Sequence, residues 1–220
     1  MGKTSVSVLL ANRFAAAPDG CLESQDPWTL LPGGPRRLLA EAASEEFGKR
    51  GFHATTTRDI ATRVGISPAG LYVHYSSKAE LLFTISQIGH EAALSSVIAA
   101  TEGLVEPAKR VKALVKSFTV WHAVNHKLAR VLQYELHALL PKHYEVIAAI
   151  RRTTQEQVED ELRRIVRPRT DLKITTNAVL SLGIDVARWY DPEKGPKPEA
   201  LGEKYGQLVM EMLGIKRPRA

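Results

Sequence analysis

Cysteine is nearly absent from this sequence of 220 residues, in which Cys21 is the only one. A single cysteine excludes a disulfide framework within the chain and a zinc site built from several of its cysteines. Aromatic residues are also few, at 6%, and no uncharged apolar run approaches the roughly 20 residues that a membrane-spanning helix needs. With 44% hydrophobic and 25% charged residues, the composition is that of an ordinary globular protein, and we predict no association with a membrane.

Sequence motifs of common enzyme chemistry are missing as well. The sequence contains no glycine-rich phosphate loop, no nucleophile elbow and no HExxH helix. His122 and His126 share a helix face and are spaced to hold a metal ion, but histidine pairs on helices are more often unrelated core or surface residues. We therefore predict no enzymatic activity, no cofactor and no metal site.

Acidic residues are outnumbered by basic ones. Lys and Arg together number 30 against 24 Asp and Glu, which gives a formal net charge of +6. A positive net charge favours a polyanionic partner such as a nucleic acid. The excess is spread along the chain, so charge alone does not locate a face that binds nucleic acid.

The first 34 residues differ in character from the rest. An apolar stretch at 6–11 resembles the core of a secretory signal, but Asn12 and Arg13 interrupt it after about half the usual length. Closely spaced prolines and glycines follow, as in a loose connecting segment. We predict a flexible N-terminal arm over 1–34 and a cytoplasmic protein.

Between Arg36 and Asp191 proline is rare, and apolar residues recur with a period close to 3.6, as in amphipathic helices. Proline is tolerated in the first turn of a helix and breaks its interior, so each proline marks a helix start or a junction. No alternating stretch is long enough to predict a strand. The predicted fold is all-α with about nine helices, over 36–50, 56–64, 68–75, 78–101, 107–125, 127–139, 142–167, 171–190 and 198–213.

Residues 56–75 have the layout of a helix-turn-helix. Thr56 and Asp59 are spaced as a capping box for the first short helix, and Gly65 permits the turn. Ser67 and Pro68 then start the second helix, which in such a unit presents its N-terminal residues to base edges in the major groove. A helical hairpin inside an α bundle, as in an adaptor protein without DNA affinity, is the alternative.

The residue types around this unit suit contacts with DNA. The second helix begins with Pro68, Ala69 and Gly70, whose small side chains let the backbone approach the bases. Arg58, on the first helix, can read a guanine through two hydrogen bonds. Ser67, which is the N-cap of the second helix, belongs to the same predicted DNA-binding surface. The predicted donors to phosphate oxygens are Thr56, Thr57, Tyr72, His74 and Lys78.

Four strings of residues stand out around this unit: Thr55-Thr56-Thr57-Arg58-Asp59-Ile60-Ala61, Val64-Gly65-Ile66-Ser67, Leu71-Tyr72-Val73-His74-Tyr75 and Ser77-Lys78-Ala79-Glu80-Leu81. Through these strings the region 36–85 resembles the N-terminal signature of the TetR family of transcriptional regulators. Two positions depart from the usual family pattern: Pro68 stands where many relatives carry lysine, and Val73 where many carry an aromatic residue or histidine. Because Pro68 has no side-chain donor, we expect fewer direct base contacts.

The resemblance implies a helix-turn-helix DNA-binding domain over 35–80 and a ligand-binding and dimerisation domain over 81–220, with a homodimer formed through the last two helices. Segments 187–192 and 201–205 are similar to TetR-type repressors of fatty-acid and steroid catabolism, several of which respond to acyl-CoA thioesters. We therefore expect a ligand-responsive repressor that binds double-stranded DNA at a palindromic operator and is released by a small molecule, with an acyl-CoA or another lipid-derived compound as the candidate effector.

Six residues are candidates for contact with that effector. Ligand cavities in helical bundles are lined by aromatic side chains and a few polar ones, and Arg188 can pair with a phosphate of a CoA-type ligand. For each of them the alternative is ordinary core packing or, for Arg188, an ion pair with a carboxylate. The other five candidates are Trp121, His122, Gln133, Tyr134 and His137.

Overall fold

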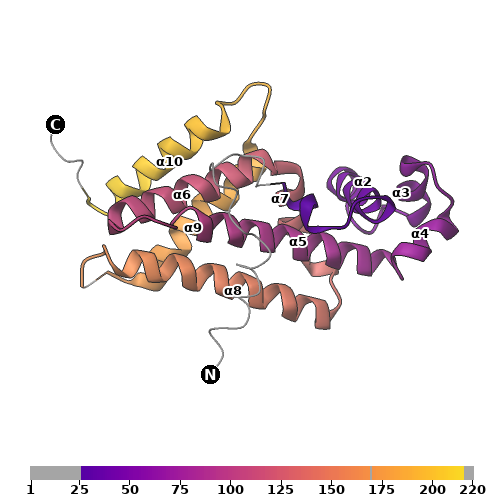
Figure 1. Cartoon of the computed structure of the whole chain (residues 1–220), viewed down its shortest axis with the longest axis horizontal. Helices are drawn as coiled ribbons and strands as arrows, with labels where there is room; N and C mark the ends of the chain where they lie inside the picture. The colour runs from indigo at the N-terminus through magenta and orange to yellow at the C-terminus, as the bar shows by residue number, and fades with distance from the viewer. Residues whose placement is uncertain (1–25, 169, 216–220) are drawn as a thin grey trace. The chain divides into compact units, whose positions relative to one another are not determined.

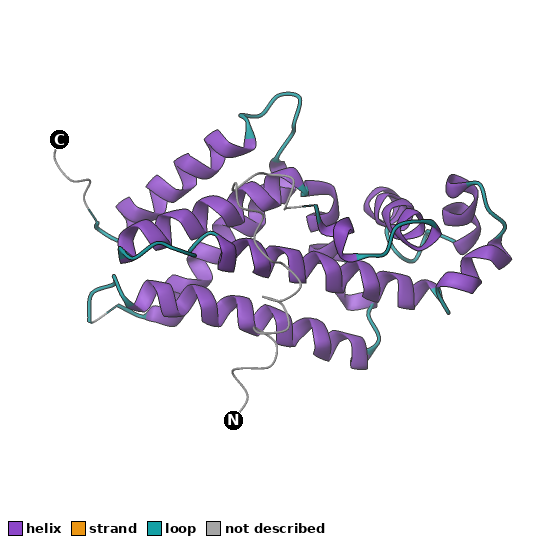
Figure 2. Cartoon of the chain, viewed as in Figure 1, coloured by secondary structure: helices purple, strands orange, loops and turns teal. Residues whose placement is uncertain are grey.

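The computed structural model describes residues 26–168 and 170–215, and over these residues the chain is helical with no strand (Figures 1 and 2). Residues 1–25 of the predicted arm and the basic end of the chain lie outside the described residues. The helices are α2 (Pro35–Arg50), α3 (Thr57–Val64), α4 (Pro68–His74), α5 (Lys78–Ala99), α6 (Pro107–Val124), α7 (His126–Tyr134), α8 (Pro141–Arg163), α9 (Leu172–Trp189) and α10 (Pro198–Met212), with 3-10 turns at Pro27–Leu30 and Leu136–Ala138.

The predicted all-α fold is confirmed, and prolines begin most of the helices as expected. Pro68, Pro107 and Pro198 each occupy the first turn of a helix. The helix predicted over 127–139 is different: α7 ends at Tyr134, and a 3-10 turn follows. The backbone of Glu135, with φ −103° and ψ 4°, lies outside the helical region, and this residue separates the two elements.

One compact unit contains residues 26–92 and 127–150, and we call it the α2–α4 unit. Its core is made of apolar side chains from several helices. Helix α7 packs closely on two of them, because Val131 lies against Gly48 of α2 and Leu132 against Gly89 of α5. A methyl group at Gly89 would lie 2.6 Å from Leu132, so the Leu132 side chain would have to shift to make room for it. The largest fully buried side chains of this core are Leu39, Phe47, Ile60, Leu71, Tyr75, Leu81, Leu82, Ile85 and Ile147.

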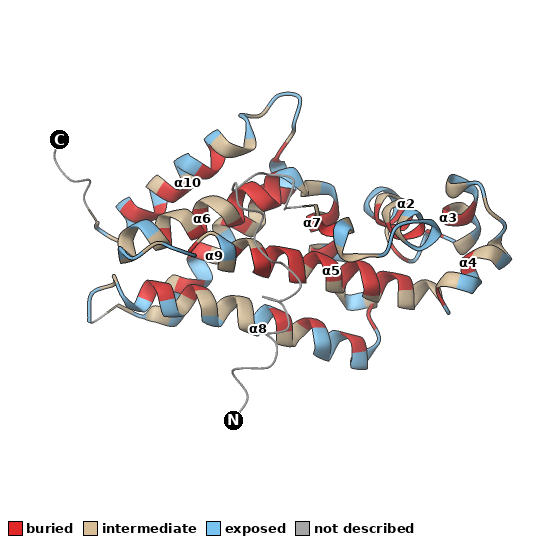
Figure 3. Ribbon diagram, viewed as in Figure 1, coloured by how far each residue is buried: buried red, intermediate tan, exposed pale blue. Residues whose placement is uncertain are grey.

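The other compact unit, the α9–α10 unit, contains residues 93–126 and the described residues from 151 onward. Helix α10 approaches α6 through glycines: a methyl group at Gly202 would lie 2.6 Å from Val120, and one at Gly206 would lie 3.1 Å from the carbonyl oxygen of Lys112. These glycines let the two backbones come close. Buried and exposed residues alternate along α10: the buried face lies on α6, and the exposed face is turned to solvent (Figure 3).

A buried ion pair joins α6 to α8 in this unit. The Arg110 guanidinium donates to both carboxylate oxygens of Glu161, at 2.8 and 2.6 Å. It also donates to the carbonyl oxygens of Thr101 and Leu104 in the preceding loop, at 2.7 and 2.8 Å. Four hydrogen bonds thus satisfy a charge that is largely removed from water.

Among the described helices, α5 is long and apolar enough to cross a membrane by length and composition alone. Two thirds of its most apolar stretch, 67%, is buried inside the protein. Burial of this kind is what the core helix of a helical bundle shows.

Candidate nucleic-acid interface

Helix α3 begins with the predicted capping box. The Thr56 hydroxyl oxygen accepts from the backbone N–H of Asp59 at 3.1 Å, and the Asp59 carboxylate accepts from the backbone N–H of Thr56 at 2.8 Å. The Thr56 hydroxyl also donates to that carboxylate at 2.7 Å, and these bonds lower the pKa of Asp59. The Thr56 hydroxyl, which we predict from the sequence to donate to a phosphate, is therefore already engaged in the helix cap. Its phosphate contact stays a prediction.

The turn and the start of α4 follow the sequence pattern. Gly65 adopts φ 78° in the left-handed region, which a side chain would strain. The Ser67 hydroxyl oxygen accepts from the backbone N–H of Gly70 at 3.1 Å, and Pro68 occupies the first helical turn. Both short helices thus begin with a side-chain cap, and Gly65 forms the turn between them.

The surface of α3 and α4 exposes the side chains that could meet DNA. Tyr72 and Val73 are 52% and 80% exposed, and Ala69 is also exposed. The Tyr72 hydroxyl lies 3.3 Å from the hydroxyl of Thr57, so α4 touches the first turn of α3. Arg58 is exposed and makes no ion pair or hydrogen bond with any residue that the structure describes. Its guanidinium is therefore available to a partner.

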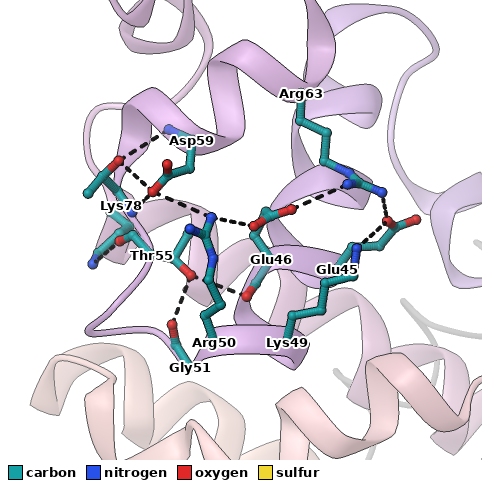
Figure 4. Close-up of polar contacts among 10 residues, drawn as sticks. Glu45, Glu46, Lys49, Arg50, Gly51, Thr55, Asp59, Arg63 and Lys78 are labelled. Carbon is teal, nitrogen blue, oxygen red and sulfur yellow. Dashed lines mark hydrogen bonds and ion pairs between the residues drawn. The ribbon is translucent and has the colours of Figure 1, made fainter.

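A network of charged side chains fixes α3 on α2 (Figure 4). Arg63 of α3 pairs with Glu45 and Glu46 of α2. Arg50 bridges Glu46 and the Asp59 carboxylate of the capping box, the latter at 3.5 Å. Sequence reasoning missed this network. The only local signal for it is the four-residue spacing of Glu45 and Lys49, and of Glu46 and Arg50, along α2.

Lys78, at the start of α5, is partly buried, and its ammonium group is bound within the protein. Its ammonium group donates to the carbonyl oxygens of Phe52 and Thr55, both at 2.6 Å, and lies 4.3 Å from the centre of the Phe52 ring. Burial lowers the pKa of Lys78. An ammonium has three hydrogens, so one is left for a phosphate, and the phosphate contact of Lys78 stays a prediction.

The loop before α3 is also held by Glu135, the residue that follows α7. The backbone N–H of Phe52 donates to the Glu135 carboxylate at 3.2 Å, while Lys78 holds the carbonyl oxygen of the same residue. The Thr55 hydroxyl donates to the carbonyl oxygens of Gly51 and Glu46. These bonds position Thr56, the residue at which α3 is capped.

Two family models match the chain over most of its length. The model described as "Bacterial regulatory proteins, tetR family" matches residues 39–94, which contain the helix-turn-helix. The model described as "Tetracyclin repressor-like, C-terminal domain" matches residues 105–213. This chain belongs to the TetR family of transcriptional regulators. The prediction made from the strings in 55–81 is thus confirmed, and the family is one of DNA-binding regulators.

Two relatives show over how much of its length this regulator is similar to named proteins. The transcriptional activator FasR of Mycolicibacterium smegmatis is 39% identical over 89 residues, which is 40% of this chain and only 41% of FasR. The transcriptional repressor KstR2 of the same organism is 24% identical over 188 residues, covering 81% of this chain and 90% of KstR2.

Two solved structures share the fold of the regulator. A tetR-family regulatory protein from Rhodococcus RHA1 is 34% identical, with a TM-score of 0.78 over 84% of this chain and 100% of that one. AibR, solved with isovaleryl coenzyme A and operator DNA, is 20% identical, with a TM-score of 0.70 over 81% of this chain and 97% of AibR. At that identity the likeness to AibR shows the fold alone.

The candidate effector residues of the regulator fall into both compact units. Trp121 and His122 lie in the α9–α10 unit, are buried, and touch through their rings at 4.9 Å. The indole N–H of Trp121 has no hydrogen-bond partner among the described residues, whereas the Nδ1 atom of His122 lies 2.8 Å from the carbonyl oxygen of Phe118. Arg188 is exposed and bonds the Asp185 carboxylate at 2.7 and 3.0 Å, which is the ion pair named above as the alternative.

The other three candidates, Gln133, Tyr134 and His137, belong to the α2–α4 unit around the end of α7. Tyr134 and His137 are exposed, and the ring of His137 lies 6.2 Å from that of His53. An effector role for any of the six candidates stays a prediction.

Proposed function

We propose that this regulator binds a palindromic operator as a homodimer, with one α4 helix entering the major groove at each half-site. The observation that carries the proposal is the exposed surface of α3 and α4, on which Arg58, Tyr72 and Val73 face solvent while both helices are capped. Beside two short capped helices, the exposed Arg58 guanidinium has no carboxylate partner among the described residues. This favours a DNA-binding role over the alternative of an adaptor protein. Two-fold symmetry requires the two α4 helices to lie about 34–36 Å apart.

The proposed dimer interface is the solvent-facing side of α9 and α10. Large apolar side chains lie exposed on both helices, among them Ile174 at 67% and Met212 at 55%. Trp189 and Leu208 add to this apolar surface. An apolar area of this kind on a helix pair favours burial against a second copy.

The proposed effector is an acyl-CoA or another lipid-derived compound, and the proposed action is release from the operator. Support comes from AibR, whose structure contains isovaleryl coenzyme A, and from KstR2, which is named a repressor and matches most of this chain. A coupling free energy of about 1–3 kcal/mol between effector and operator is enough to change occupancy substantially. Because it is a DNA-binding transcriptional regulator, we propose that the protein acts in the cytoplasm.

A fluorescence polarisation titration tests these proposals. The probe is a duplex from the intergenic region upstream of the regulator's own reading frame, measured at two salt concentrations with and without a panel of acyl-CoA thioesters. We expect binding that is much tighter than to a scrambled duplex and is relieved by one thioester. Tight binding that no thioester relieves would overturn the effector class alone. Binding no tighter than to the scrambled duplex would contradict operator recognition at this sequence.

Gly70→Ala tests the close approach of α4 to the bases. The added methyl would lie at ordinary contact distances, 3.5 Å from the Ser67 hydroxyl and 3.6 Å from Ile66, so we expect a melting temperature equal to or above that of the wild type. Operator affinity should fall because the methyl separates the helix from the groove. Gly65→Ala is the control, since strain at its positive φ lowers stability. Unchanged affinity of Gly70→Ala would remove Gly70 from the interface.

A further inference from the structure

The cations of the helix-turn-helix are mostly neutralised within the protein. Residues 35–80 contain seven Lys and Arg residues. Four of them pair with carboxylates, and Lys78 donates to backbone carbonyls. Arg36 and Arg58 likewise have no carboxylate at ion-pair distance among the described residues, and unlike Lys78 both are exposed. The four paired cations are Arg37, Lys49, Arg50 and Arg63.

Arg36 lies in the first turn of α2, and its side chain reaches the end of α4. One guanidinium nitrogen donates to the carbonyl oxygen of His74, the last residue of α4, at 3.1 Å. The guanidinium carbon lies 4.7 Å from the centre of the Tyr75 ring. The buried Tyr75 in turn donates its hydroxyl to the carbonyl oxygen of Arg36 at 2.9 Å. This reciprocal contact holds the guanidinium beside the proposed recognition helix.

The contact leaves most of the guanidinium free. Of its five N–H donors one is used by His74, and Arg36 is exposed to solvent. Stacking on an aromatic ring limits the rotamers of an arginine, so binding an anion costs less side-chain entropy. The guanidinium fork matches the geometry of a phosphate group and binds it through two hydrogen bonds.

We propose that Arg36 binds a phosphate of the DNA backbone next to the groove that α4 enters. The proposal rests on the DNA binding proposed above and adds a contact from outside the helix-turn-helix motif itself. Through its bond to His74, Arg36 also ties the position of that phosphate to the end of α4. Arg36 supplies affinity and register, while sequence is read by other side chains.

The test is the salt dependence of binding to a duplex that the wild-type protein selects from a random pool. Each phosphate that the protein no longer neutralises makes the negative slope of log K against log salt shallower by about 0.9, so Arg36→Gln should make it shallower by about 1.8 for a dimer. Affinity should fall by about tenfold or more for each phosphate that is no longer bound. Arg37→Gln is the matched control, because it removes the same charge from the adjacent residue, which is paired with Asp26 and Glu41.

We expect Arg37→Gln to keep the wild-type slope. Equal slopes for the Arg36→Gln and Arg37→Gln variants would overturn the phosphate contact, since long-range charge would then explain both. If the role of Arg36 were purely structural, Arg36→Gln would lower the affinity for DNA but leave the slope unchanged, because the same number of ions would be released on binding. If Arg36→Gln lowers the melting temperature, Arg36→Met takes its place, because its side chain still packs on Tyr75 without a charge. Failure of the wild-type protein to select any sequence would contradict the proposed function instead.

Discussion

Replacing Arg58 with alanine is expected to remove the preference of the regulator for one base pair in each half-site. The structure leaves this guanidinium exposed and without a partner among the described residues, one position from Thr57, which contacts Tyr72 of α4. A bidentate contact with guanine contributes about 1–3 kcal/mol of discrimination against the wrong base. Because the two half-sites are well separated, the losses of discrimination free energy at the two should add.

The measurement for Arg58→Ala is a competition assay with duplexes that carry single base changes across one half-site. The wild-type protein should show a strong penalty at one position, and the variant a flat response there. Lys49→Ala is the charge-matched control, because Lys49 is exposed on α2 and only weakly paired with Glu45. We expect the control to keep the wild-type profile. An Arg58→Ala profile that matches the wild type would assign base readout to other residues.

Replacing Arg110 with alanine is expected to destabilise the protein by about 3 kcal/mol, because the buried Glu161 carboxylate would lose both hydrogen bonds from Arg110 and keep only the longer ion pair with Arg164, at 3.7 Å. The side chain of Glu161 is only 8% exposed. Arg163→Ala, which removes an exposed arginine paired with Glu159, should cost at most about 1 kcal/mol. Urea titrations at one fixed protein concentration give both values.

A second variant and a pH series check the cause of that destabilisation. Arg110→Met combined with Glu161→Leu should recover much of the stability, since no buried charge remains. The Arg110 hydrogen bond lowers the pKa of Glu161 below its ordinary value of 4.5. The ion pair therefore stabilises the protein fully above that ordinary value, and its contribution disappears as pH falls through the lowered pKa of the folded state. The gap between wild type and Arg110→Ala should narrow in acid, and a constant gap would contradict the ion-pair explanation.

The elements that the sequence predicts well are those defined by neighbours within a few residues. The capping box of Thr56 and Asp59 spans three positions, and Ser67 and Pro68 begin α4 through their own side chains. The break after Tyr134 was missed because no proline or glycine marks it, and the backbone of Glu135 leaves the helical region there without either signal.

Site residues were harder to predict where their partners are remote. The Lys78 side chain suits a phosphate by composition, but its ammonium is bound to carbonyl oxygens 26 and 23 residues away. Arg36 gave no sequence signal at all, because its contact with His74 spans 38 residues. Neither Arg63 nor Arg50 could be assigned to the α2–α3 network without knowing which face of α2 meets α3.

The sequence by itself determined the helical class, most helix boundaries and the helix-turn-helix with its family, since periodicity, proline and capping act through bonds within one or two turns. Tertiary structure decided which charges stay available to DNA. Arg37, Arg50 and Arg63 are neutralised by carboxylates, whereas Arg58 and Arg36 have none at ion-pair distance among the described residues. That distinction depends on distances between side chains that only packing brings together, and Coulomb attraction between fixed charges is strong only at such short range.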